Sequence, residues 1–132
     1  MHAKMIACWF GSVFLFPLFG PAADAIYPVK VSENRRYFVD QEGKPVFWLG
    51  TTQWQVFRDN TVEEASTIFS NVKSKGFAFV QAMLLGPGDG TRSNVHGESP
   101  WSAVDPLTPN EAYFKHVDGV VQSARDENVV IS

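Results

Sequence analysis

The chain has 132 residues, with 11 Lys and Arg against 14 Asp and Glu, a formal net charge of −3 and 45% hydrophobic residues. This composition is too apolar for an intrinsically disordered protein and indicates one globular unit with a packed core. Lys and Arg form no run that would give a basic patch for the phosphates of a nucleic acid, so we expect no nucleic-acid partner. The three His residues and the single Cys are scattered, so the sequence predicts no metal site, and it contains no motif for a cofactor.

The first 25 residues have the pattern of a signal peptide. Residues 1–4 carry a positive charge, residues 5–19 are almost entirely apolar, and Ala23-Asp24-Ala25 is a small-x-small cleavage site. We therefore expect cleavage after Ala25, a mature chain of residues 26–132 without cysteine, a secreted or periplasmic location and no membrane contact after cleavage. The alternatives are a transmembrane anchor and a lipoprotein signal at Cys8, but Cys8 lies near the start of the apolar stretch instead of following it.

A β-hairpin is predicted at the start of the mature chain. The β-like runs at residues 36–39 and 46–49 flank residues 40–45. In this turn Gly43 is able to adopt a positive φ, and Pro45 has no backbone N–H to donate to a neighbouring strand. Residues 46–49 are apolar without alternation. This pattern is typical of a strand that is covered on both faces, as in a parallel sheet.

A helix follows with clear start and stop signals. Thr61 and Glu64 form a predicted capping box, apolar residues then recur at helical spacing, and Gly76 supplies a left-handed stop. Residues 77–84 read as a second buried strand, which completes one strand–helix–strand unit.

A long loop, residues 86–109, precedes the second helix. Loops of this length in a compact domain are usually functional. Thr108 is the predicted N-cap of the helix, with Pro109 at its first position and Glu111 completing the box. Asn128 is predicted to close the helix, and residues 129–132 begin a third strand.

This order predicts an α/β fold, the amino-terminal part of a (β/α)₈ TIM barrel preceded by a β-hairpin. Such a barrel needs about 250 residues, so residues 26–132 would supply about two and a half of its eight units, truncated at the carboxyl end. The alternative is a small complete open α/β sheet. It is disfavoured because a Val-Val-Ile edge strand would stay uncovered.

In parallel α/β folds the reactive side lies at the carboxyl ends of the strands. The strand-end rule places Trp54, Gln81, Asn94 and His96 on one rim, as candidate substrate-binding residues. The indole of Trp54 suits stacking on a sugar ring, and the other three suit hydrogen bonds to its hydroxyls. The alternatives are that Trp54 is a core residue and that His96 is an ordinary surface residue.

Several short motifs resemble one known family. They are Phe47-Trp48-Leu49-Gly50, Thr52-x-Trp54, Lys75-Gly76-Phe77 and, above all, Asn110-Glu111-Ala112-Tyr113-Phe114 with His116-Val117-Asp118. Together they resemble the start of the apiosidase-like (β/α)₈ glycoside hydrolases, long known as a domain of unknown function. Two positions depart from the pattern, since the family usually has Asp at position 51 and Glu at position 55, where this chain has Thr51 and Gln55.

The resemblance implies an exported enzyme that removes sugars from plant or algal polysaccharides. It also implies two catalytic carboxylates at the ends of later strands, the fourth and seventh, so residues 1–132 hold no catalytic residue and are expected to be inert alone. Two alternatives remain. One is a non-catalytic carbohydrate-binding or structural protein on the same scaffold, and the other is a small complete exported α/β binding module.

Overall fold

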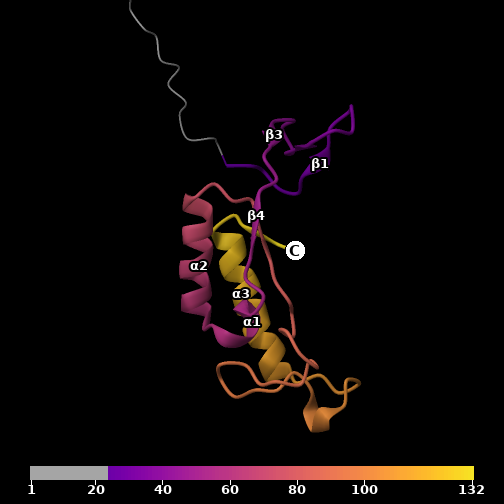
Figure 1. Cartoon of the computed structure of the whole chain (residues 1–132), viewed down its shortest axis with the longest axis vertical. Coiled ribbons are helices and arrows are strands. Elements are labelled where there is room, and N and C mark those ends of the chain that lie inside the picture. Colours follow the sequence, from indigo (N-terminus) through magenta and orange to yellow (C-terminus); the bar gives the residue numbers. More distant parts are fainter. Residues whose placement is uncertain (1–23) are drawn as a thin grey trace, which may run out of the picture.

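The computed structural model describes residues 24–132, which form two small sheets and two long helices (Figure 1). Of the predicted signal peptide, only Asp24 and Ala25 lie within the described residues. The elements in chain order are β1 (Lys30–Val31), β2 (Phe38–Val39), β3 (Pro45–Val46), β4 (Gly50–Thr52), α1 (Val56–Asp59), α2 (Val62–Ser74), β5 (Phe79–Gln81), the 3₁₀ helix η1 (Ser102–Val104), α3 (Glu111–Asp126) and β6 (Val130–Ile131). None of the helices described is both long and apolar enough to cross a membrane.

The two sheets have different strand directions. In the first, β1, β2 and β3 pair antiparallel in that order, with Phe38 opposite Val46. In the second, β4, β5 and β6 pair parallel, with Thr51 opposite Val80 and Val80 opposite Ile131. The parallel sheet and the long helices α2 and α3 between its strands confirm the predicted α/β class. In Figure 1 the antiparallel sheet lies beyond the end at which β4 begins.

The predicted strand at residues 46–49 is wrong in its position and its burial. Val46 ends β3 in the antiparallel sheet, and the parallel strand begins only at Gly50. Between them the Leu49 N–H donates to the Phe47 carbonyl at 2.9 Å, a tight bend that breaks the extended run. The Phe47 side chain is 79% exposed, because this apolar run passes from one sheet to the other instead of crossing a covered sheet.

The start of α2 has the predicted capping box. The Thr61 hydroxyl accepts from the Glu64 N–H at 3.2 Å, and the Glu64 carboxylate accepts from the Thr61 N–H at 2.9 Å. Gly76 adopts φ 78° just after the helix, as the stop signal predicts. The two hydrogen bonds of the capping box join residues three positions apart, which is why this pattern could be recognised in the sequence.

The start of α3 differs from the prediction. Asn110 is the N-cap, and its side-chain oxygen accepts from the Ala112 N–H at 3.1 Å. Pro109, predicted at the first helical position, instead forms an isolated antiparallel bridge with Trp101. This bridge keeps the backbone extended for two residues longer than expected, and the Thr108 hydroxyl donates to Asp105 within the loop. At the other end Asn128 adopts φ 54° and ends the helix, as predicted.

The core lies between the helices and one face of the parallel sheet. Phe69 of α2, Val120 of α3 and Val80 of β5 are fully buried together. The residues that flank Val80 point to the opposite face, because side chains alternate along a strand. On that face the Phe79 ring lies over Gly50 and stacks on Trp48, with ring centroids 4.8 Å apart.

Candidate functional site

A polar hollow of about 600 Å³ opens where the chain leaves β4. It is lined by Thr52, Gln53, Trp54, Gln55, Val56, Asp59, Asn60 and Pro87, and we call it the outer hollow. The Gln53 N–H donates to the Gln81 carbonyl at 2.8 Å, and the Met83 N–H donates to the Trp54 carbonyl at 3.2 Å. These bonds fix the backbone of Trp54 against the segment after β5, while its side chain stays 49% exposed. Within residues 24–132, Trp54 is therefore about half exposed.

A second hollow, of about 340 Å³, lies on the sheet itself and is called here the inner hollow. Its lining residues are Gly50, Thr51, Thr52, Phe79 and Gln81. The two hollows meet at Thr52, which lines both. The structure therefore brings Trp54 and Gln81, two of the four candidate residues, to adjoining hollows at the carboxyl ends of β4 and β5.

An ion pair on α1 forms one edge of the outer hollow. Arg58 is only 1% exposed, and its guanidinium donates to both oxygens of Asp59, through Nε at 2.7 Å and Nη2 at 3.2 Å. Its Nη1 donates to the Pro87 carbonyl at 3.1 Å, which ties the start of the long loop to α1. The hydrogen bond from Arg58 lowers the pKa of Asp59, so this carboxyl stays ionised at neutral pH.

Gln55 completes this group of side chains. In the amide orientation that satisfies both neighbours, its nitrogen donates to Asp59 Oδ2 at 2.9 Å and its oxygen accepts from Arg58 Nη2 at 3.1 Å. Gln55 and Asp59 are four residues apart, the spacing at which helical side chains meet. The side chain of Asp59 remains 46% exposed toward solvent.

Asn94 closes a turn within the long loop. Its side-chain oxygen accepts from the His96 and Glu98 N–H groups, each at 3.0 Å, and its own N–H donates to the Glu98 carbonyl. The residue is 6% exposed, and within residues 24–132 its Nδ2 has no hydrogen-bond partner. Asn94 does not line either hollow.

His96 lies beside α3 rather than beside the hollows. Its exposed ring meets the ring of His116 edge to face, with centroids 4.8 Å apart. Burial lowers the pKa of His116, and the neighbouring His96 lowers it further, whereas the carbonyls of Asn60 and Phe57 and the Glu63 carboxylate oppose the shift. The structure thus separates Asn94 and His96 from the linings that contain Trp54 and Gln81.

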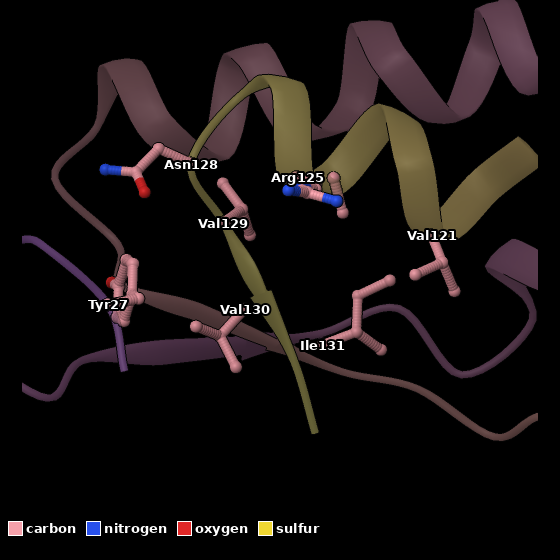
Figure 2. Close-up of a pocket in the computed structure, with 8 residues that line it drawn as sticks. Tyr27, Val121, Arg125, Asn128, Val129, Val130 and Ile131 are labelled. Carbon is pink, nitrogen blue, oxygen red and sulfur yellow. The ribbon is translucent and has the colours of Figure 1, made fainter. Parts of the chain in front are cut away.

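Another hollow, of about 420 Å³, lies between α3 and β6 (Figure 2). Its lining is mostly aliphatic, with Val121 and Ile131 among the labelled side chains. Tyr27 lies at one end of it, where its hydroxyl donates to the Ala78 carbonyl at 3.3 Å. This hollow offers few of the polar groups that catalysis or sugar binding requires.

Comparison with known proteins gives the family. The model of the family described as "Apiosidase-like, catalytic domain" matches residues 32–132. The chain belongs to the apiosidase-like family. A comparison with curated proteins found no similar sequence.

Two solved structures resemble the apiosidase-like chain. A glycoside hydrolase family 5 protein from Bacteroides vulgatus is 28% identical, with a TM-score of 0.64 over 78% of this chain and 23% of its own. A second structure, named glycoside hydrolase, is 24% identical, with a TM-score of 0.66 over 79% of this chain and 24% of its own. The apiosidase-like chain therefore spans about a quarter of the length of these structures.

The two sequence departures noted above fall in the two hollows of the apiosidase-like chain. Thr51 lines the inner hollow, and Gln55 lines the outer hollow. Each places a neutral group where the resemblance led us to expect a carboxylate. At position 55 the neutral amide has a clear use, because it donates to Asp59 and accepts from Arg58 at once, which a carboxylate is unable to do.

Sequence reasoning missed Arg58, Asp59 and the short helix that carries them. The available signal was the spacing of Gln55 and Asp59 directly after a strand end. Nothing in the sequence indicated that Arg58 is buried against Pro87, 29 residues away. Among residues 24–132 of this apiosidase-like chain, no group of three or more His, Cys, Asp or Glu side chains is placed to hold a metal ion.

Proposed function

We propose that this chain is the amino-terminal part of an exported glycoside hydrolase, built as a (β/α)₈ barrel, that removes sugars from plant or algal polysaccharides. The observation that carries the proposal is the family match over residues 32–132. The parallel order β4, β5, β6 with α2 and α3 between the strands supports the barrel, because it has the repeated strand–helix arrangement of that fold.

The catalytic carboxylates are proposed to come from beyond these residues. Glycoside hydrolysis uses two carboxyl groups, one of which must donate a proton to the leaving oxygen. Asp59 is the only carboxylate that lines the two hollows, and the hydrogen bond from Arg58 lowers its pKa, so it is a poor proton donor at neutral pH. We therefore expect residues 26–132 to be inert alone.

Substrate binding is proposed for Trp54 and Gln81 first. The exposed indole of Trp54 offers a flat apolar face to the C–H groups of a sugar, and Gln81 offers an amide to its hydroxyls. We keep Asn94 and His96 as candidates for contacts with a longer glycan. Their support is the unpartnered Nδ2 of Asn94 among the described residues and the exposed ring of His96.

A non-catalytic carbohydrate-binding protein on the same scaffold is the second candidate, because Thr51 and Gln55 replace acidic residues. Incubation of the full-length protein with a panel of plant and algal polysaccharides, followed by chromatography of released sugars, distinguishes the two. Release of free sugar is the expected result. Retarded migration in polysaccharide-containing gels without any release would favour the binding protein, and the absence of both would refute both.

Export rests on the sequence pattern of residues 1–25. Intact-mass analysis of protein recovered outside the cytoplasm should give Ile26 as the first residue. Protein that keeps Met1 would contradict the proposed cleavage.

A further inference from the structure

We propose that the outer hollow, between Trp54 and Asp59, is a binding position for one neutral sugar residue, next to a separate position in the inner hollow at Gln81. This inference rests on the proposed function and deepens it, because it makes the recognised ligand an oligosaccharide of at least two residues. The juxtaposition of the hollows at Thr52 supports two adjacent positions. A volume of about 600 Å³ also lies within the range of small-molecule sites.

One wall of the outer hollow is an exposed indole held in place by its own backbone. The Trp54 carbonyl accepts from the Met83 N–H, so the residue is anchored to the segment after β5 while 49% of it stays exposed. Covering the apolar face of this indole with a ligand would remove apolar surface from water, which is favourable. Stacking on a sugar ring would cover the apolar face and leave the indole N–H free for a hydroxyl.

The Asp59 carboxylate, also in the lining of the outer hollow, has one free hydrogen-bond acceptor. A carboxylate accepts about four hydrogen bonds. On Asp59, Arg58 Nε occupies Oδ1, while Arg58 Nη2 and the Gln55 amide occupy Oδ2. This leaves roughly one lone pair, on Oδ1, and the carboxylate is 46% exposed. Asp59 is thus oriented by two neighbours and is still able to accept from a sugar hydroxyl.

The charges around the hollow favour a neutral sugar over an acidic one. Arg58 is 1% exposed and donates to Asp59, Gln55 and Pro87, so it offers nothing to a ligand carboxylate. Asp59 is the charged side chain in the lining of the outer hollow, and that lining contains no Lys or Arg, so a uronic acid bound there would meet a carboxylate without a lining cation to pair with. Arg92, in the exposed loop, also acts on Asp59, and only at longer range.

Two further amides line the hollow. Within residues 24–132 the side chains of Gln53 and Asn60 make no hydrogen bond. Each amide has two donors and an acceptor available for sugar hydroxyls. The lining therefore combines an aromatic face, amides and one oriented carboxylate, a set suited to a polyhydroxylated neutral ring.

The test is titration calorimetry on the full-length protein, which needs no turnover. Xylotetraose and cellotetraose serve as neutral probes, and tetragalacturonate serves as the anionic probe. If the protein hydrolysed no glycan, the proposed function would be refuted, but the calorimetric test of the binding position would still be valid. Trp54→Ala should weaken binding of the neutral probe by about 2- to 13-fold, the scale of one aromatic contact.

Two further variants separate binding from folding. Asp59→Asn removes the oriented acceptor, but it also deprives the buried Arg58 of its counter-ion, so its melting temperature must be measured beside its affinity. Gln53→Ala leaves that ion pair untouched and should weaken binding by about threefold, the scale of one neutral hydrogen bond. Tyr37→Ala is the matched control, since Tyr37 lies directly before β2, is 47% exposed and lines neither hollow, so this variant should keep full affinity.

The expected result is loss of neutral-probe affinity in Trp54→Ala and Gln53→Ala at unchanged melting temperature, with Tyr37→Ala unaffected. Three results would overturn the inference: no binding of either neutral probe by the wild-type protein, equal affinity in wild type and Trp54→Ala, or tighter binding of tetragalacturonate than of both neutral probes.

Discussion

Replacement of Gly50 by alanine tests the packing that joins the two sheets. Gly50 begins β4 and does not have a positive φ, so its backbone conformation does not require glycine. A Cβ added there would overlap the ring of Phe79, its cross-strand partner in β5. The same ring stacks on Trp48, which contacts Phe38 of the antiparallel sheet.

The cost follows from these contacts. Overpacking of a packed site typically costs about 1–3 kcal/mol. Displacement of the ring would also weaken the Trp48–Phe79 pair, worth about 0.5–1.5 kcal/mol. Alanine also restricts the unfolded chain more than glycine does, which stabilises the folded protein by about 0.4–1 kcal/mol. Gly50→Ala should therefore lower the free energy of unfolding by about 1–3 kcal/mol, although a Gly→Ala change at this φ would otherwise stabilise.

The assay is urea unfolding of the full-length protein, monitored by circular dichroism, for a double-mutant cycle. Phe79→Leu removes the ring, so Gly50→Ala should cost at least 1 kcal/mol less in that background, within the coupling range for residues in contact. An equal cost in both backgrounds, or a Gly50→Ala protein as stable as wild type, would show that the ring is not the reason for glycine at this position.

Asn110→Ala should destabilise by about 0.5–2 kcal/mol, because it removes the α3 cap together with the Nδ2 hydrogen bonds to Glu98 and Ser99, whereas Thr108→Ala should cost less than about 0.5 kcal/mol. Equal costs of the two variants in chemical denaturation would contradict the role of Asn110 at the start of α3. Because the pKa of His116 is lowered in the folded protein, the unfolded chain binds the proton more readily, and stability should fall as the pH drops below about 6.5. In melting curves between pH 7.5 and 5, His116→Phe should make this pH dependence weaker, and an unchanged dependence would contradict the role of His116. Residues 26–132 alone should aggregate or lack a cooperative melting transition, because the edges of the parallel sheet stay unpaired; a sharp transition of a monomer would instead support a complete small domain.

Local signals in the sequence were sufficient where the deciding contacts are local. The capping box of Thr61 and Glu64, the stop at Gly76 and the left-handed Asn128 all depend on bonds or dihedral angles within a few residues. The α/β class followed from the order of these segments. The strand-end rule also placed Trp54 and Gln81 together, because parallel strands of one sheet end at one edge.

Contacts between distant residues decided the rest. The bridge between Trp101 and Pro109 moved the start of α3 to Asn110, and the passage from one sheet to the other left Phe47 exposed. Arg58 is buried because Pro87, 29 residues away, accepts from its guanidinium, which in turn orients Asp59 at the outer hollow. No spacing in the sequence encodes such a pair, since the two segments meet only when the parallel sheet brings the ends of β4 and β5 side by side.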